Sequence, residues 1–340
     1  MIDSPAVKAP AIEASAIEAR GLKVHFKTGA GLVRAVDGVD LSIPIGAFHG
    51  IVGESGCGKT TLARAIIGLQ SATEGQVRIN GRDRAEWQAE DRKAFARAVQ
   101  FIFQDPLGSM SRRQTVGQTL EEPLLIHGIG NALQRKARLA ELLDLVALPA
   151  SVLDRIPRSL SGGQRQRVSI ARALALNPSL LICDEPLSAL DVSVRAQIVN
   201  LFARLQAQLG LTIVIVAHDL AIVREVCTGV TVMYLGRIAE EGVTRPLFAA
   251  PAHPYTQALL SAVPSPDPRV EATRPRILLE GDPPSPRNPP SGCRFSTRCP
   301  VVQDQCRRAE PTLRLVPHGG RAACLLADAT ARPDITALVI

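Results

Sequence analysis

One eight-residue segment restricts the fold of this 340-residue chain more than any other feature. Residues 53–60 read G-x-x-x-x-G-K-T and directly follow the short apolar run 47–52. Glycines allow successive backbone N–H groups to curl around phosphate oxygens, and a helix that begins there adds the positive end of its dipole. The order of strand, glycine-rich loop and helix predicts a phosphate-binding loop, followed by a helix over residues 60–69.

The side chains of this loop have specific expected partners. Lys59 should reach the β- and γ-phosphates of a nucleotide, and the Thr60 hydroxyl should coordinate Mg²⁺. A glycine-rich turn without a ligand would not require both residues in register after an apolar strand. The predicted nucleotide-binding residues of this segment are Gly53, Glu54, Ser55, Gly56, Cys57, Gly58, Lys59, Thr60 and Thr61.

The remaining apolar pattern alternates strands with helices, which indicates an α/β fold with a mostly parallel sheet. Two continuous apolar runs, 179–183 and 212–217, suit parallel strands that are covered on both faces. Further strands are expected at residues 21–28, 33–43, 47–52 and 99–103, further helices at 164–176 and 194–209, and a hairpin at 230–240 that turns at Gly236.

Composition narrows the classes of function. No apolar run reaches the roughly 18–20 residues needed to cross a bilayer, so other chains would have to supply any membrane spans. The net charge is +7, but only 3% of residues are aromatic and no five-residue Lys/Arg cluster occurs. An arginine-rich solvated surface explains the charge better than nucleic-acid binding, and we expect no nucleic-acid partner.

Two acidic residues end a very apolar segment. Asp184 and Glu185 follow residues 180–183, so they are expected at the carboxyl end of a buried strand, where ligands bind in open α/β sheets. Asp184 can hold Mg²⁺ there through water. An ordinary acidic pair would not explain why two charges follow so apolar a run, where burying them is costly.

A second glycine motif, LSGGQ at residues 160–164, precedes another expected helix. Ser161 and the two glycines at a helix N-terminus form a second anion-binding site. The first site already holds this chain's own nucleotide, so the second has no obvious ligand within the monomer.

The combination of phosphate loop, LSGGQ and the strand-end Asp184-Glu185 pair resembles the ATP-binding cassette (ABC) family. The resemblance implies a phosphate-loop NTPase cassette, with a RecA-like parallel core, an antiparallel β subdomain and a helical subdomain. It also implies a head-to-tail dimer, in which Ser161 and Gly163 contact the γ-phosphate of the partner's ATP. The implied residues of this second site are Ser161, Gly162, Gly163 and Gln164.

The same resemblance implies roles for residues elsewhere in the chain. Glu185 would be the general base, His218 the switch histidine at the γ-phosphate, and Gln104 the Q-loop residue that senses Mg²⁺ and the attacking water. Asp191 belongs to the D-loop that bridges the two sites, and Phe26 is the candidate for stacking on adenine. The implied magnesium-site residues are Thr60, Gln104 and Asp184.

Further segments are similar to the dipeptide/oligopeptide importer ATPases. They are residues 53–59, 121–125, 188–197, 233–237 and the HPYTQALL segment at 253–260. The resemblance covers roughly residues 21–325 and is strongest to the F-type subunit. It implies a D-type ATPase partner, two membrane permeases, a solute-binding protein outside the membrane, and a peripheral location on the cytoplasmic face of the bacterial inner membrane. Residues 108–113 read GSMSRR, where this group usually reads SLNPR.

Four of the seven cysteines crowd into the last 50 residues, spaced C-x5-C-x6-C-x17-C. Four thiolates can hold zinc or a [4Fe–4S] cluster, and structural zinc favours tight C-x2–4-C pairs, which are absent. Members of the peptide-importer group carry an iron–sulfur cluster at matching cysteines, so the resemblance favours [4Fe–4S] over zinc. The implied ligands are Cys293, Cys299, Cys306 and Cys324.

These features divide the chain into parts. The predicted parts are a loose N-terminal tail at 1–20, a nucleotide-binding domain at 21–253 with a helical subdomain at about 105–165, a small irregular extension at 254–326, and a tail at 327–340. Nine prolines between Pro264 and Pro290 predict a linker inside the extension.

The expected function is ATP hydrolysis that drives uptake of di- or oligopeptides or similar small solutes. The alternative is a soluble cassette ATPase that acts on nucleic acid or ribosomes, but such proteins usually carry tandem cassettes or long coiled-coil insertions. A phosphate-loop kinase would leave LSGGQ unexplained. The sequence leaves open whether the solute is a dipeptide, an oligopeptide, glutathione, nickel or an opine, and whether the dimer has identical subunits.

Overall fold

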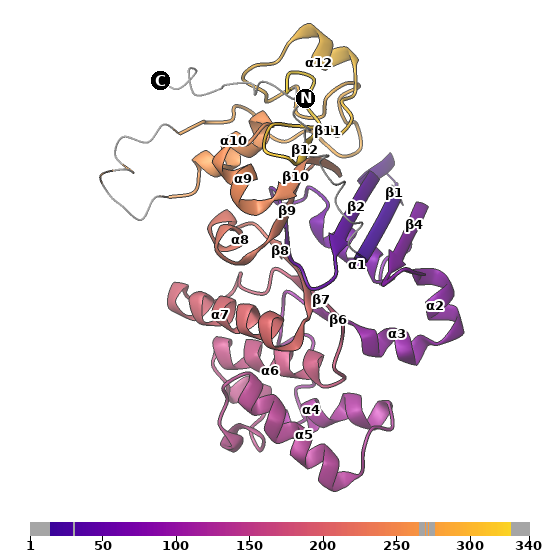
Figure 1. The fold of residues 1–340 in the computed structure, drawn as a ribbon, viewed down its shortest axis with the longest axis vertical. Coiled ribbons are helices and arrows are strands. Elements are labelled where there is room, and N and C mark those ends of the chain that lie inside the picture. The colour runs from indigo at the N-terminus through magenta and orange to yellow at the C-terminus, as the bar shows by residue number, and fades with distance from the viewer. Residues whose placement is uncertain (1–13, 30, 265–268, 270, 272–275, 328–340) are drawn as a thin grey trace, which may run out of the picture.

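The computed structural model describes residues 14–29, 31–264, 269, 271 and 276–327. The molecule is elongated, with a helical region at one end, two sheets in the middle and a smaller, loop-rich region at the other end (Figure 1). The larger sheet has eight strands in the order β11-β12-β10-β9-β3-β8-β7-β6. Its six longer strands are β3 (Phe48–Val52), β6 (Val99–Ile102), β7 (Leu180–Asp184), β8 (Thr212–Ala217), β9 (Gly229–Tyr234) and β10 (Arg237–Val243), and its two short strands are β11 (Arg314–Leu315) and β12 (Arg321–Ala322).

The centre of this sheet is parallel, and helices cover it. β3 pairs in parallel with β8 and β9, and β7 pairs in parallel with β6 and β8. Every residue of β3, β7 and β8 is buried, which explains why these strands are mostly apolar and do not alternate between polar and apolar residues. The helices around it are α1 (Lys59–Ile66), α6 (Gly162–Leu174), α7 (Val192–Leu209) and α8 (Leu220–Val226). The α/β fold with a mostly parallel central sheet, which the sequence predicted, is confirmed.

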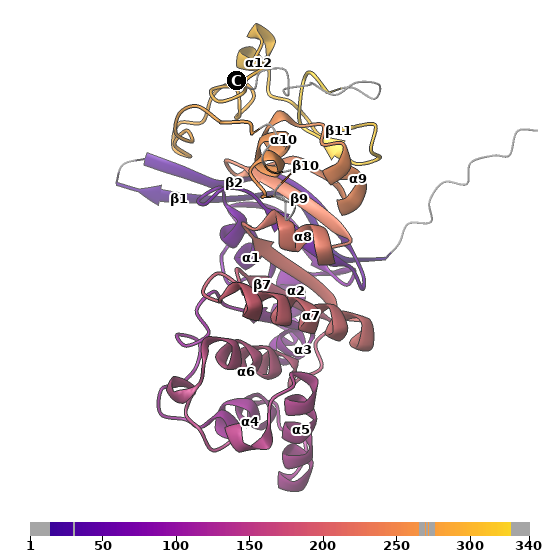
Figure 2. The same cartoon turned by 90° about the vertical axis from the view of Figure 1, so that its left-hand side faces the viewer.

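A second, antiparallel sheet lies beside the first and has the order β2-β1-β4-β5. Its strands are β1 (Ser15–Thr28), β2 (Gly31–Pro44), β4 (Glu74–Ile79) and β5 (Arg82–Asp83). In Figure 2, β1 and β2 run alongside β9 and β10. Two short helices, α2 (Arg84–Glu90) and α3 (Arg92–Ala98), lead from this sheet to β6.

The start of β1 corrects the predicted N-terminal tail. The loose tail was expected to extend to residue 20, but the strand begins at Ser15, and Ala16 and Ile17 are fully buried. Ile17 pairs with Ile43 on one side and with Ile79 on the other, so the alternating apolar residues of this segment are held between two strands. The rest of the predicted tail, residues 1–13, lies outside the described residues.

The helical region holds α4 (Val116–Ile126), α5 (Ala132–Leu145) and two short 3-10 turns, Ala150–Val152 and Pro157–Ser159. Both α4 and α5 begin with a capping box, in which the N-cap side chain and a glutamine three residues later bond each other's backbone N–H groups. These helices pack against α6, and through it they connect to the central sheet.

The C-terminal extension is more regular than the sequence indicated. It contains α10 (Pro254–Ser261), α12 (Asp304–Arg308), β11 (Arg314–Leu315) and β12 (Arg321–Ala322), and α9 (Thr244–Ala249) leads into it from β10. β12 pairs with β10, so the extension adds two short strands to the edge of the central sheet. The predicted tail from residue 328 onward, and much of the proline-rich linker, lie outside the described residues. No helix in the described part is long and apolar enough to cross a bilayer.

Candidate functional site

The phosphate loop lies between β3 and α1, as the sequence predicts. Gly58 is the N-cap of α1 and has a positive φ of 106°, a backbone conformation that favours glycine. The Lys59 ammonium is buried inside the loop and donates hydrogen bonds of 2.8 Å to the backbone oxygens of Gly53 and Glu54. These two contacts commit two of its three protons to the loop and fix the position of its charge.

The Thr60 hydroxyl lies beside the end of β7. It donates a hydrogen bond of 2.7 Å to Asp184 Oδ1, so two predicted magnesium-site residues from segments 124 positions apart meet. Asp184 is fully buried, and desolvation by burial raises the pKa of its carboxyl group above the usual value. Its second oxygen, Oδ2, has no hydrogen-bond partner within the described residues, and Arg64 Nη2 lies 3.7 Å away. A buried carboxylate with an uncommitted oxygen fits a divalent cation.

Glu185 adopts a strained backbone conformation at the end of β7. Its φ is +45°, which is uncommon for a residue other than glycine. Its backbone N–H donates 3.0 Å to Val216 O on the neighbouring strand, and its backbone oxygen accepts from the Ser188 hydroxyl at 3.1 Å. Such strain persists only where the surroundings hold it, and it clusters at functional sites.

Two further predicted residues gather at the Glu185 carboxylate. Gln104, which follows β6, donates a hydrogen bond of 3.0 Å from Nε2 to Glu185 Oε2. His218, which follows β8, places Nδ1 3.8 Å from the same oxygen. The carboxyl ends of β6, β7 and β8 therefore bring all three predicted catalytic residues together.

The LSGGQ segment starts a different helix. Ser161 is the N-cap of α6, and it forms a capping box with Gln164, whose side chain accepts from the Ser161 backbone N–H at 3.0 Å. Gly162 and Gly163 form the first turn, and a Cβ atom at Gly163 would lie 2.6 Å from Val194 Cγ1 of α7. Ser161 is exposed, so this helix N-terminus is open to solvent.

Asp191, the predicted D-loop residue, and Phe26, the predicted adenine-stacking residue, lie at the start of α7 and on β1. Asp191 is the N-cap of α7, but its side chain makes no capping hydrogen bond. Phe26 lies half-buried on β1 opposite Val33, and packs against the core under the antiparallel sheet.

Residues 36–188 match the ABC transporter family, and residues 239–306 match the oligopeptide/dipeptide transporter C-terminal region. A putative peptide import ATP-binding protein of Brucella ovis is 48% identical over 306 residues, covering 90% of this chain and 96% of that protein. The oligopeptide transport ATP-binding protein OppF of Escherichia coli is 46% identical over 302 residues, covering 86% and 90%.

The chain belongs to the ABC transporter ATPases. Among solved structures, the dimeric post-hydrolysis ATP-binding cassette MJ0796 with bound ADP and Pi is 31% identical. The match has a TM-score of 0.62 and covers 67% of this chain and 99% of that one. CbiO1 from Clostridium perfringens, part of the transporter complex cbiONQ, is 26% identical with a TM-score of 0.63, covering 70% and 92%. The enzyme activity of this cassette is ATP hydrolysis.

The extension contributes residues to the phosphate loop that sequence reasoning did not assign. Tyr255 Oη accepts a 2.8 Å hydrogen bond from the Glu54 backbone N–H, and Arg298 Nη1 donates 2.7 Å to the Glu54 carboxylate. Residues 253–255, HPY, signalled the start of α10 but not the contact with the loop. His253 caps α10 by accepting from the Tyr255 backbone N–H at 3.0 Å, and Pro254 is the first helical residue.

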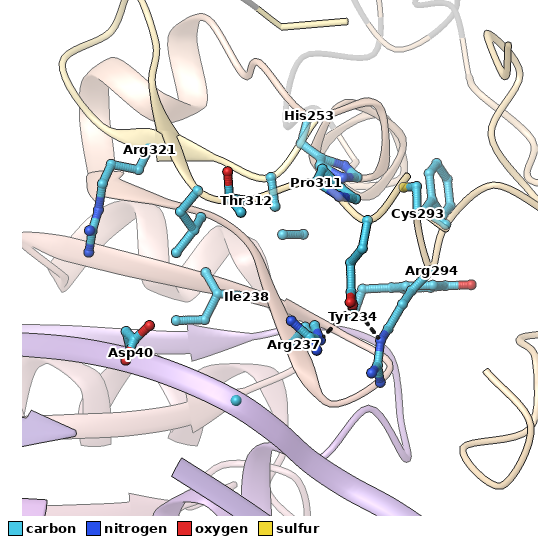
Figure 3. A pocket seen from close by; sticks show the side chains of 16 residues that line it. Asp40, Tyr234, Arg237, Ile238, His253, Cys293, Arg294, Pro311, Thr312 and Arg321 are labelled. Carbon is cyan, nitrogen blue, oxygen red and sulfur yellow. Dashed lines mark ion pairs between the residues drawn. The ribbon is translucent and has the colours of Figure 1, made fainter. Parts of the chain in front are cut away.

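Ion pairs anchor the extension to the cassette around a cavity of about 350 Å³ (Figure 3). Arg237 of β10 lies 2.9 Å from Glu310, and the same carboxylate lies 3.7 Å from Nε of Arg294. The buried Arg294 guanidinium also pairs with Asp37 of β2. These contacts join the extension to both sheets.

The four late cysteines are free thiols close to one another. The Cys293 backbone N–H donates 2.8 Å to Cys306 O. Burial raises the pKa of Cys293 to about 11 and that of Cys299 to about 12, and the neighbouring thiols add to both shifts. Backbone N–H groups two or three residues further along donate to the sulfurs of Cys293, Cys299 and Cys324. Even so, no three acidic, histidine or cysteine side chains in the described residues have the spacing to hold a metal ion.

Proposed function

We propose that this chain is the ATP-hydrolysing subunit of an importer for peptides or similar small solutes. The observation that carries the proposal is the union of a complete cassette with the oligopeptide/dipeptide transporter C-terminal region, which contacts the phosphate loop directly. Relatives named as peptide import or oligopeptide transport ATP-binding proteins support it over almost their whole length. No comparable support exists for the alternative, a soluble ATPase acting on nucleic acid or ribosomes.

The proposed chemistry is largely a matter of positioning and charge neutralisation. Lys59 neutralises the β- and γ-phosphates from within the loop. Thr60, Asp184 and Gln104 would hold Mg²⁺, which supplies positive charge at the phosphates. Glu185 accepts the proton of the attacking water, and Gln104 holds its carboxylate in place. His218 contacts the γ-phosphate from the end of β8.

The nucleotide would be enclosed between two subunits. The loop residues Gly53–Gly58 and Thr61 bind its phosphates, and Phe26 stacks on adenine. The exposed N-terminus of α6, with Ser161 and Gly163, binds the γ-phosphate of the ATP that a partner subunit holds. Gln164 stabilises the N-terminus of α6 through the capping box. Asp191 links the two nucleotide sites of the dimer. The dimeric MJ0796 cassette supports such an arrangement.

We further propose a set of protein partners. The chain pairs with a second, D-type ATPase beneath two membrane permeases, and a solute-binding protein delivers the solute from outside. Its location is then peripheral, on the cytoplasmic face of the bacterial inner membrane. We also propose that the chain divides into a cassette that ends at residue 253 and an extension at 254–326. The cassette, predicted to start at residue 21, starts at Ser15, where β1 begins.

The four cysteines are proposed to bind a [4Fe–4S] cluster, with zinc as the alternative. Their convergence and the backbone N–H groups directed at three of the sulfurs support a thiolate-bound group, because such donors stabilise thiolates. The bound group would stabilise the C-terminal extension, which has only a small hydrophobic core of its own. Protein purified without oxygen should be brown, with broad visible absorbance and about four iron atoms per chain. Zinc without iron would contradict the cluster.

The function is tested by co-purifying the assembled complex and measuring ATP-dependent uptake with the cognate binding protein. Glu185→Gln in this chain should lower steady-state ATP hydrolysis by about 100-fold or more, because a general base contributes that much, while nucleotide binding persists. The matched control is Glu122→Gln, which changes a half-exposed carboxylate that pairs with Arg172. Hydrolysis that stays essentially intact in Glu185→Gln would show that the assignment is wrong.

A further inference from the structure

Glu54 differs from the other loop residues because three of its groups are engaged at once. Its backbone N–H donates to Tyr255 Oη at 2.8 Å, its carboxylate accepts from Arg298 Nη1 at 2.7 Å, and its backbone oxygen accepts from Lys59 Nζ at 2.8 Å. The first two partners belong to the C-terminal extension, 201 and 244 positions away in the chain. Glu54 therefore connects the extension to the ammonium group of the loop.

The two extension residues are themselves held firmly. Tyr255 is fully buried, and its ring packs against Tyr234 and Phe295 with centroids 4.7 and 5.4 Å apart. The Arg298 side chain is only 8% exposed, so its pairing with Glu54 is shielded from water. Shielding strengthens a charge-assisted hydrogen bond, and a packed aromatic ring has little freedom to move.

A second route from the extension reaches the same loop. Arg294, which lies beside Tyr234 in Figure 3, donates 2.7 Å from Nη1 to the backbone oxygen of Leu235. The next residue, Gly236, donates its backbone N–H to Cys57 O at 2.8 Å. The extension therefore fixes the loop at Glu54 directly and at Cys57 through the turn between β9 and β10.

We propose that the extension positions the phosphate loop, and that Tyr255 and Arg298 are positioning residues for ATP binding. They orient Glu54, whose backbone oxygen in turn orients Lys59. Neither side chain touches the nucleotide. The inference rests on the proposed role of Lys59 at the phosphates. It also gives a reason why this ATPase carries the extension, because the extension holds the phosphate loop in its binding conformation.

The test compares four variants of the full chain in the assembled complex. Arg298→Ala and Tyr255→Phe should each raise KM for ATP several-fold, up to about tenfold, the effect of one lost hydrogen bond. Arg298→Lys keeps the charge and should recover part of the loss. Arg321→Ala is the matched control, because it removes another ion pair of the extension, Arg321 with Glu241, that lies on β10 away from the loop. Its KM should stay within twofold.

A double-variant cycle separates positioning from simple stability. If Arg298 acts through Glu54, then Arg298→Ala should add little to the KM of Glu54→Gln. Melting temperatures are measured alongside, because a purely structural role would lower them without changing KM. A KM within twofold of wild type in both Arg298→Ala and Tyr255→Phe would overturn the inference. Unchanged nucleotide binding in Lys59→Ala would instead overturn the proposed nucleotide site. Failure of the positioning role can therefore be told apart from failure of the site itself.

Discussion

The chain has two glycine-rich helix N-termini, and they are supported in different ways. The phosphate loop before α1 is held from many directions: Lys59 bonds it from inside, Tyr255 and Arg298 bond it from the extension, and Gly236 bonds it from the β9–β10 turn. The N-terminus of α6 is capped mainly by its own Ser161 and Gln164, and it is exposed. The phosphate loop is therefore supported by the rest of its own chain, whereas the α6 terminus is open to solvent, as a site that binds a partner's nucleotide would be.

The glycines of the two sites also differ in how much space surrounds them. A Cβ at Gly58 would lie 2.1 Å from the backbone oxygen of Ala35, which cannot move without moving the sheet. A Cβ at Gly163 would lie 2.6 Å from one methyl group of Val194, a side chain that can change its rotamer. At Gly58 the phosphate loop therefore has less freedom to change shape than the α6 terminus has at Gly163.

The largest expected effect is that of Gly58→Ala. The positive φ and the clash with Ala35 combine, and a displacement of about 1 Å in a binding loop can cost about 100-fold. We expect the ATP affinity of the chain to fall by at least about 100-fold, measured by titration with a fluorescent nucleotide. Gly56→Ala has a positive φ but meets no neighbouring atom, so it should lose less. Equal affinities for both variants would refute the rigid-loop account.

A smaller effect is expected for Gly163→Ala. The chain's own ATP affinity should be unchanged, and the unfolding free energy should fall by about 1 kcal/mol, the usual scale of mild overpacking. Adding Val194→Ala should remove the clash and recover that stability. The comparison would fail if Gly163→Ala weakened nucleotide binding to its own chain.

A third expected effect concerns pH and the support that the extension gives to the phosphate loop. Burial lowers the pKa of His253 to about 4, and Glu240, whose oxygen Oε2 accepts from the His253 backbone N–H, opposes that shift. The unfolded chain takes up the proton near the ordinary value of about 6.5, so stability is full above that pH and is lost as the pH falls toward 4. Acidification should weaken nucleotide binding at the loop before it disturbs α6.

His253→Asn provides the control for this pH dependence. Asparagine can still cap α10 and does not titrate, so its unfolding curve should change less between pH 6.5 and 4.5 than that of the wild type. The buried His49, whose pKa burial also lowers to about 4, remains in both proteins and accounts for a residual slope. Identical slopes in the two proteins would show that His253 does not carry the effect.

Much of this architecture could be predicted from sequence because its signals are local. The strands β3, β7 and β8 are almost entirely apolar, and functional residues lie at or just after their carboxyl ends. The phosphate-loop motif assigned Thr60 to Mg²⁺ and the strand-end position assigned Asp184 to it, and the hydrogen bond between the two side chains fits a shared site.

Other features depend on tertiary contacts that no local pattern reveals. β4 has only two buried positions, Val77 and Ile79, and its pairing with β1 also explains why β1 begins as early as Ser15. The contacts of Tyr255 and Arg298 with Glu54 join residues more than 200 positions apart. The signature around His253 indicated the family of the extension, but it gave no direction toward the loop.

The central claim is that the α6 terminus serves the partner's nucleotide. The most direct measurement is vanadate trapping with a photoreactive ATP analogue in the assembled complex, followed by separation of the labelled subunits. With Ser161→Glu in this chain, a negative charge would repel the phosphate from that helix start. We predict that labelling of the partner subunit is lost while labelling of this chain persists. Loss of labelling on this chain alone, or equal labelling of both subunits, would contradict the account.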